Sequence, residues 1–210
     1  GVSYILKTNY GIEVPKNMQE ELGYVVKSVS DHEHAELSAK RIYDIFVDKY
    51  VNNNEVFYVS NAEFVQGGGF LATVSIHHNG KEHLVKANGN GRLDAVANAL
   101  RQYFGTDYEL SDYEEHALTG GSTSKAVTFV GIIYEDKKYW GVGFDEDIIK
   151  ASIDALVSAL NQPEKLRFIE EKEERLTNIL NIIQENYKEV TLDMLAEKTF
   201  LSKPYLSKYI

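Results

Sequence analysis

Residues 70–95 read FLATVSIHHNGKEHLVKANGNGRLDA, and the fold can be built outward from them. Runs rich in Phe, Val, Thr and Ile at 70–78 and 82–87 predict two strands. Asn79-Gly80 between them predicts a type I′ turn, because both central positions of that turn need a positive φ. The stretch therefore predicts an antiparallel hairpin followed by a glycine-rich segment.

A pattern of three strands and a helix occurs twice along the chain. In the first half, a strand over 56–65 joins the hairpin through three glycines at 67–69, and a helix over 93–104 follows it. The second half is predicted to contain strands over 108–118, 126–134 and 139–142, turns at Gly120-Gly121 and 135–137, and a helix over 146–160. A repeat spacing of roughly 55 residues indicates an internal duplication. Each half has one apolar sheet face to bury, so we expect the halves to pack on each other or on a partner chain.

Helical segments flank the duplicated part. Apolar residues at helical spacing predict helices over 17–29 and 38–50, and Ser38 is suited to cap the second. We therefore predict an α+β fold. It has a small helical subdomain at 1–51, a duplicated βββα domain at 55–161 and a short helical tail at 164–210.

The composition excludes several classes of protein. The 210 residues are 43% hydrophobic, carry a net charge of -10 and include no cysteine. An acidic chain is poorly suited to bind nucleic acid or anionic membranes over its whole surface. Without cysteine it has no disulfide framework and no thiolate metal site, which suits the cytoplasm. No apolar run is long enough to cross a membrane. Because the chain starts at Gly1 with neither methionine nor a signal pattern, we expect it to be cut from a longer protein.

The segment 88–94 combines two glycines with a predicted helix start. Gly89 and Gly91 allow a ligand to approach the backbone closely, and the first N–H groups of a helix have no partner within it. Such a segment suits a carboxylate or a phosphate. Taken alone, the motif is more typical of a structural turn from strand to helix.

The wider context changes that balance, because three further groups of motifs accompany this segment in order. They are residues 1–7 with Tyr10, Gly11, Ile12 and Pro15; Tyr113 with Glu115, His116 and Ala117; and residues 140–143 with Asp147, Ile148, Ala151, Ser152, Ala155 and Asn161. With the Gly-Asn-Gly motif at 89–91 and Leu93, Asp94 and Ala95, they resemble the C-terminal regulatory region of the 2-isopropylmalate synthase and citramalate synthase family. The resemblance covers residues 1–161.

This resemblance implies an allosteric module that binds leucine, or isoleucine as in citramalate synthases, near the interface of a homodimer. It implies feedback control of leucine biosynthesis. The acyltransferase chemistry of the family, with its divalent metal and acetyl-CoA, belongs to a barrel upstream of Gly1. We therefore assign no catalytic residue, metal ligand or cofactor to this chain. Two residues depart from the family pattern, because Arg92 replaces a proline and Ala87 replaces a glycine.

A free amino acid needs N–H donors for its carboxylate, an oxygen for its ammonium group and an apolar slot for its side chain. The candidates for these three roles are Gly89 and Gly91 for the carboxylate, Asp94, Asp145 or Asp147 for the ammonium group, and Leu93, Leu110, Tyr113, Ala117 and Phe144 for the slot. Several of the apolar candidates also fit ordinary core positions.

Three histidines flank the predicted hairpin. His77 and His78 are consecutive in a strand, so they point to opposite faces of the sheet and do not form a simple ligand cluster with His83. We expect these histidines to be solvated side chains of the hairpin.

The tail carries an apolar stripe at helical spacing. The stripe comprises Leu176, Ile179, Leu180, Ile183 and Tyr187, and we expect it to pack against Leu192, Leu195, Leu201 and Leu206. Residues 179–210 resemble the first helix-turn-helix of the arabinose-operon regulator (AraC) family, which implies DNA contacts from Ser202, Lys203, Tyr205 and Lys208. A ligand-responsive transcription regulator is therefore the alternative function. Because the tail has few lysines to neutralise phosphates, we expect it to bind DNA weakly or not at all.

Overall fold

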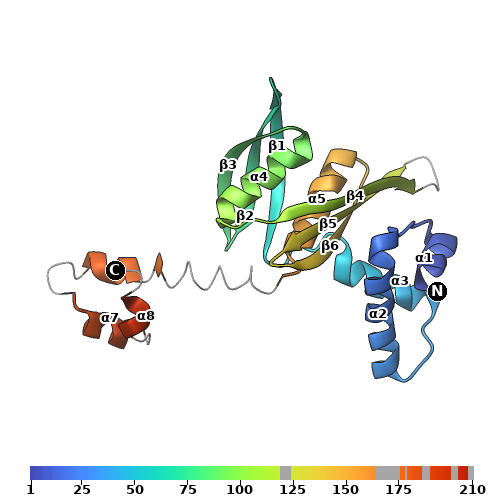
Figure 1. Cartoon of the computed structure of the whole chain (residues 1–210), viewed down its shortest axis with the longest axis horizontal. Coiled ribbons are helices and arrows are strands. Elements are labelled where there is room, and N and C mark those ends of the chain that lie inside the picture. Colours follow the sequence, from blue (N-terminus) through green and yellow to red (C-terminus); the bar gives the residue numbers. More distant parts are fainter. Residues whose placement is uncertain (119–123, 164–175, 178, 186–189, 200–202, 208–210) are drawn as a thin grey trace. The chain divides into compact units, whose positions relative to one another are not determined.

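A computed structural model describes residues 1–118, 124–163, 176–177, 179–185, 190–199 and 203–207. The chain forms two compact units, Gly1–Pro163 and Glu164–Ile210. The first unit contains two separate three-stranded antiparallel sheets and the helices that cover them (Figure 1). The predicted α+β class is confirmed.

Three helices begin the first unit: α1 (Val2–Tyr10), α2 (Lys16–Glu33) and α3 (Ala39–Tyr50). Ser38 caps α3 as predicted, and its hydroxyl accepts a hydrogen bond from the N–H of Arg41. The sequence did not predict α1, a short helix whose Leu6 is fully buried in the tertiary core. Short helices depend on such packing more than on their own propensity.

The first half of the duplication comprises β1 (Phe57–Gln66), β2 (Phe70–His78), β3 (Lys81–Gly89) and α4 (Arg92–Phe104). Its sheet has the order β1-β2-β3. The predicted hairpin is confirmed, because Asn79 and Gly80 have φ values of 54° and 69°.

The second half comprises β4 (Glu109–Leu118), β5 (Lys125–Tyr134), β6 (Lys137–Asp145) and α5 (Ile148–Leu160). Its sheet has the order β4-β5-β6. Glu135 and Asp136 both have positive φ and form the tight turn predicted before β6. The turn predicted at Gly120-Gly121 lies outside the described residues.

Matching irregularities support the duplication. The first strand of each half has a β-bulge, between Val59 and Asn61 in β1 and between Leu110 and Asp112 in β4. A bulge adds one residue to a strand and changes which side chains share a face. The two halves meet where α4 contacts α5, and α5 also contacts β1.

Helices pack on both faces of the sheet β4–β6, and α5 does so over β5 and β6. On one face, Gly141 and Gly143 leave room for α5: a Cβ at Gly143 would lie 2.8 Å from the carbonyl carbon of Ala151. On the other face, a single apolar cluster joins the sheet to α1, α2 and α3. Its most buried members include Leu6, Met18, Leu22, Phe46, Tyr50, Phe129, Trp140 and Val142. The strands β5 and β6 therefore lie between α5 and the α1–α3 segment, whereas β4 keeps Tyr113 and Ala117 exposed on the α5 side.

The two consecutive histidines of β2 differ in their exposure to solvent. His78 is only 2% exposed, and its Nδ1 lies 2.9 Å from the hydroxyl of Tyr103 in α4. The expectation that it is solvated is wrong, because its face of β2 is the one that α4 covers. His77 points to the opposite face, as predicted, where it stacks on Tyr58.

In the second unit, α7 (Leu192–Thr199) and α8 (Lys203–Leu206) belong to a small apolar cluster of Ile179, Ile182, Leu195 and Leu206. The predicted stripe is wrong at Leu180, which is 57% exposed, while Ile182 is buried in its place. Spacing alone leaves the direction of a short apolar face uncertain by one residue. Tyr187 and Leu201 lie outside the described residues. Within the described parts of the chain, no helix is long and apolar enough to cross a membrane.

Candidate functional site

The glycine-rich segment leads from β3 into α4, and its two glycines differ in surroundings. A Cβ at Gly89 would lie 2.6 Å from Cα of Ala95 and 2.7 Å from the carbonyl carbon of Asp94. Gly89 is therefore required for the close approach of β3 to α4. Gly91 is the N-cap of α4, and a Cβ there would have no atom within 4 Å. The space in front of Gly91 is thus open.

A polar hollow of about 520 Å³ lies beside this helix start. It is lined by Gly68, Gly69, Phe70, Asn88, Gly89, Asn90, Asp94 and Asn98. Asp94 Oδ2 accepts a hydrogen bond of 2.8 Å from the N–H of Asn90, and the side-chain amide of Asn98 donates one of 2.8 Å to the carbonyl of Asn88. These two bonds hold the loop 88–90 against the first two turns of α4.

Arg92, the departure from the family's proline, is the first residue of α4. Its guanidinium carbon lies 5.8 Å from the centroid of the Phe64 ring and 5.6 Å from that of Phe70, within the range of a cation–π contact. The charge is therefore held against two aromatic rings at the rim of the hollow.

Three of the predicted apolar residues lie on one face of β4. Leu110 and Tyr113 are three positions apart, but the bulge between Leu110 and Asp112 places them on the same side as Ala117. Tyr113 is 46% exposed, and its hydroxyl lies 2.8 Å from Oγ of Ser152 in α5 and donates to Glu115 Oε2 at 2.6 Å. Burial raises the pKa of Tyr113, so its hydroxyl keeps its proton near neutral pH.

The carboxylates of Asp145 and Asp147 already form hydrogen bonds at the start of α5. Asp147 is the N-cap, and its carboxylate accepts hydrogen bonds from the N–H groups of Ile149 and Lys150. Asp145 accepts from the N–H of Asp147 at 2.9 Å and forms an ion pair with Lys150 at 3.0 Å. That backbone hydrogen bond, followed by the Lys150 ammonium, holds the pKa of Asp145 below its usual value.

The predicted site residues do not all come together in one chain. Gly89 and Asp94 line the hollow, and Leu93 is half-buried in the first turn of α4. Leu110, Tyr113 and Ala117 do not line it. Phe144 lies on the opposite face of its sheet from Tyr113, because it pairs with Val127 and packs against the α1–α3 cluster.

Sequence reasoning missed two polar residues of α5. Ser152 belongs to a family motif, but nothing in the sequence indicated that it meets the Tyr113 hydroxyl across the fold. Asp154 faces a hollow of about 180 Å³ between β1 and α5, and burial raises the pKa of its carboxyl to about 6. Among the described side chains, no group of three His, Asp or Glu residues is arranged to hold a metal ion.

Of the four predicted DNA-contacting residues, only Lys203 has a described side chain. Lys203 is in α8, where its ammonium group forms an ion pair with Asp193 of α7. Ser202, Lys208 and the side chain of Tyr205 lie outside the described residues.

Comparison with known proteins identifies the duplicated part. The family described as the LeuA allosteric (dimerisation) domain matches residues 36–163. The chain is 43% identical over 174 residues to a 2-isopropylmalate synthase of Helicobacter hepaticus, covering 77% of the chain and 31% of that protein. It is 40% identical over 162 residues to that of Desulfitobacterium hafniense and 37% over 167 residues to that of Corynebacterium glutamicum strain R, again covering 77% of the chain.

The matched segment makes up 29% of the Desulfitobacterium protein and 27% of the Corynebacterium protein. The chain thus spans roughly a third of the length of these relatives or somewhat less. The family match begins before α3 and ends after α5, so it includes both halves of the duplication and stops before the second unit. On these grounds the chain belongs to the LeuA allosteric (dimerisation) domain family and corresponds to the regulatory region of 2-isopropylmalate synthases.

Proposed function

We propose that this chain binds a branched-chain amino acid, leucine, and thereby controls by feedback the synthase of which it is the regulatory region. The observation that carries the proposal is the start of α4, where open space at Gly91 adjoins a polar hollow. The first N–H groups of a helix attract carboxylates through unpaired donors and the helix dipole. The family's description as an allosteric domain supports a regulatory role.

The binding chemistry follows from the charges at this helix start. The ligand's carboxylate would bind the N–H groups that follow Gly91. Its ammonium group would bind Asp94, whose Oδ2 is oriented by the N–H of Asn90. We favour Asp94 over Asp145 and Asp147, because Asp94 lines the hollow beside Gly91, whereas the other two carboxylates lie at the start of α5.

The ligand's side chain needs an apolar wall, and Phe70 alone among the residues lining the hollow is a large apolar side chain. We propose that a homodimer brings such a wall, formed by Leu110, Tyr113 and Ala117, to the α4 site. The family's description as a dimerisation domain supports this arrangement.

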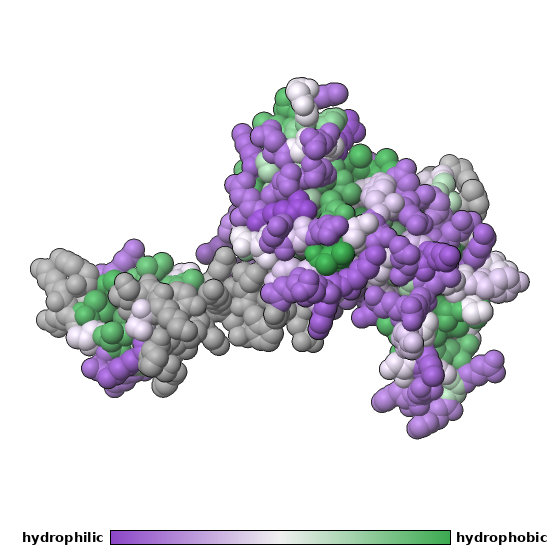
Figure 2. Space-filling view, in the orientation of Figure 1, coloured by the Kyte–Doolittle hydropathy of each residue, from purple (hydrophilic) through white to green (hydrophobic). Residues whose placement is uncertain are grey.

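Exposed apolar side chains also support a dimer. Val65 and Leu84 are 66% and 70% exposed, and their strand pairing places them on the face of β1–β3 that α4 leaves open. In the space-filling view, apolar residues interrupt the largely polar surface of the first unit (Figure 2). Large exposed apolar areas are rare on monomers. Sedimentation should give twice the chain mass of 23.8 kDa, and a monomer at tens of micromolar would contradict the dimer.

Titration calorimetry with leucine, isoleucine and valine tests the ligand. Gly91→Asp should abolish the heat of binding, because it places a carboxylate where the ligand's own carboxylate would bind. Gly23→Asp is the matched control, since a Cβ at Gly23 in α2 also meets no atom within 4 Å. Absence of heat from the unmodified chain at millimolar ligand, or unchanged affinity in Gly91→Asp, would refute the site.

The catalytic activity of the whole protein is part of the same proposal. The relatives are named 2-isopropylmalate synthases, and the chain spans less than a third of each. We place the condensation of acetyl-CoA with 2-oxoisovalerate, and its divalent metal, in the rest of the synthase. Release of coenzyme A by this chain alone would contradict that division.

A further inference from the structure

Strand β4 has two faces with different partners. Side chains alternate between the faces of a strand. Tyr113 pairs with Val130 and lies on the α5 face of the sheet, where its hydroxyl meets Ser152. His116 pairs with Val127 on the opposite face and stacks on Phe129, a member of the α1–α3 cluster. One strand thus contacts both α5 and the α1–α3 segment.

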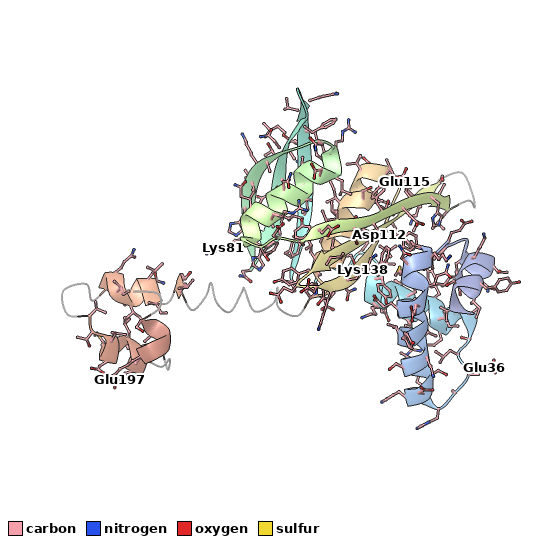
Figure 3. The ribbon with its side chains drawn as sticks, viewed as in Figure 1. Glu36, Lys81, Asp112, Glu115, Lys138 and Glu197 are labelled. Atoms are coloured by element: carbon pink, nitrogen blue, oxygen red, sulfur yellow. The ribbon has the colours of Figure 1, made fainter. Side chains whose placement is uncertain are left out.

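Two side chains of β4 bind residues in the first turn of α2 and just before it. Asp112 Oδ1 accepts a hydrogen bond of 3.0 Å from the side-chain amide of Asn17, and its carboxylate forms an ion pair with Lys138 of β6. Figure 3 shows Asp112 and Lys138 close together at this end of α2. Four residues along β4, Nε2 of His116 accepts a hydrogen bond of 3.2 Å from the N–H of Glu13. The strand is therefore attached at two points to residues 13–17.

The charge of the Asp112 carboxylate strengthens its bonds to Asn17 and Lys138. Partial burial alone would raise the pKa of its carboxyl, but bonds from Lys138, Asn17 and Ser111 outweigh this and lower it. The carboxylate is therefore ionised near neutral pH. The side chain of Asp112 is also only 17% exposed, so solvent weakly screens its electrostatic interactions with these partners.

β4 is an edge strand of its sheet and has fewer helix contacts than β5 and β6. It lies at the edge of the order β4-β5-β6 and shares its ladder only with β5. Its bulge between Leu110 and Asp112 interrupts that ladder beside the attachment to Asn17. A displacement at Tyr113 is passed directly to Asp112, its neighbour in the chain.

We propose that β4 transmits occupancy of the amino-acid site to the α1–α3 segment, with Asp112 and His116 as the positioning residues. The inference rests on the proposed function, since it assumes a ligand on the Tyr113 and Ala117 face. Binding there repositions β4, and the bonds to Asn17 and Glu13 carry the change to α2. Such coupling is reciprocal, so weakening either attachment also changes ligand affinity.

The test measures amide exchange of the full chain by NMR or mass spectrometry, with and without millimolar leucine. In the unmodified chain, leucine should change exchange at Glu13 and in the first turn of α2. Asn17→Ala and His116→Phe should each reduce this change and shift leucine affinity by about fivefold or more, the lower range of allosteric coupling. The phenylalanine keeps the stacking on Phe129 but removes the acceptor for Glu13.

Asn9→Ala is the matched control. Asn9 belongs to the same segment, but its side-chain amide bonds to the carbonyl of Ile5 within α1. This variant should retain both the exchange response and the leucine affinity. Thermal unfolding of each variant establishes that it is folded.

The outcomes distinguish failure of the proposed function from failure of the inference about β4. If calorimetry detects no binding to the unmodified chain, the proposed function fails and the inference fails with it. If leucine binds but exchange at residues 13–17 stays unchanged, the inference alone is overturned. It is also overturned if Asn17→Ala and His116→Phe keep the full response. Loss of the response in both variants, but not in Asn9→Ala, supports it.

Discussion

Replacing each glycine of the Gly-Asn-Gly motif by serine should have opposite effects on stability. At Gly89, the new Cβ would lie 2.6 Å from Cα of Ala95, whereas ordinary contacts begin at 3.4 Å. The shortfall of about 0.8 Å is against backbone, which cannot rotate away, so β3 and α4 must separate. At Gly91 a Cβ meets nothing within 4 Å, and the extended backbone of this N-cap accommodates serine.

The magnitudes follow from these two environments. Overpacking costs about 1–3 kcal/mol, and Gly89→Ser should lie near the upper end because the obstacle is backbone. For a chain of this length, about 2–3 kcal/mol lowers Tm by roughly 5–10 °C. Gly91→Ser gains a side-chain oxygen for the first turn of α4 and should change stability by only a few tenths of a kcal/mol, in the favourable direction.

Fluorescence of Trp140 is a suitable readout, because it is the chain's one tryptophan and is 1% exposed in the core of the first unit. Thermal unfolding should place Gly89→Ser well below the unmodified chain and Gly91→Ser at or just above it. A Gly89→Ser variant that melts within about 2 °C of the unmodified chain would refute the assignment of Gly89 to helix packing.

Three further predictions concern α5 and the tail. The pKa of Asp154 rises from 3.8 to about 6 on folding, so its ionisation costs stability as pH increases between these values. Asp154→Asn should therefore raise the free energy of unfolding measured in urea by about 1 kcal/mol at pH 8 but not at pH 4, and an equal gain at both pH values would contradict this. Asn161→Ala should lower the free energy of unfolding, measured in urea, by about 2–3 kcal/mol, because this buried amide bonds to backbone groups of Val56, Phe57 and Val157. A loss below ~0.5 kcal/mol would argue against that role. In mobility-shift titrations at low salt the chain should not bind DNA at sub-micromolar concentration, because Lys203 is paired with Asp193; saturable, sequence-dependent binding would reverse this view.

Local features of the fold were predictable from the sequence because they depend on a few neighbouring residues. A positive φ at Asn79 and Gly80, the Ser38 cap and the period of the strands are all decided within about one turn or one pleat. The duplication was predictable for a related reason, since it repeats such local signals. The family motifs then extended the prediction to a regulatory role.

Other features required the tertiary structure, because they depend on residues far apart in the chain. The sequence treated Gly89 and Gly91 alike, and only the packing of α4 on β3 separates their roles. Spacing could not locate the bulge that puts Leu110 and Tyr113 on one face, nor show that Phe144 belongs to the other.

The same reason applies to burial and to contacts across the fold. His78 is buried because α4 covers its face of β2, and α1 is stable because Leu6 enters a core built from distant segments. The attachment of Glu13 to His116 joins residues 103 positions apart. A sequence determines periods, turns and caps by short-range sterics and hydrogen bonding, whereas burial and contact across a fold are decided only when its segments pack together.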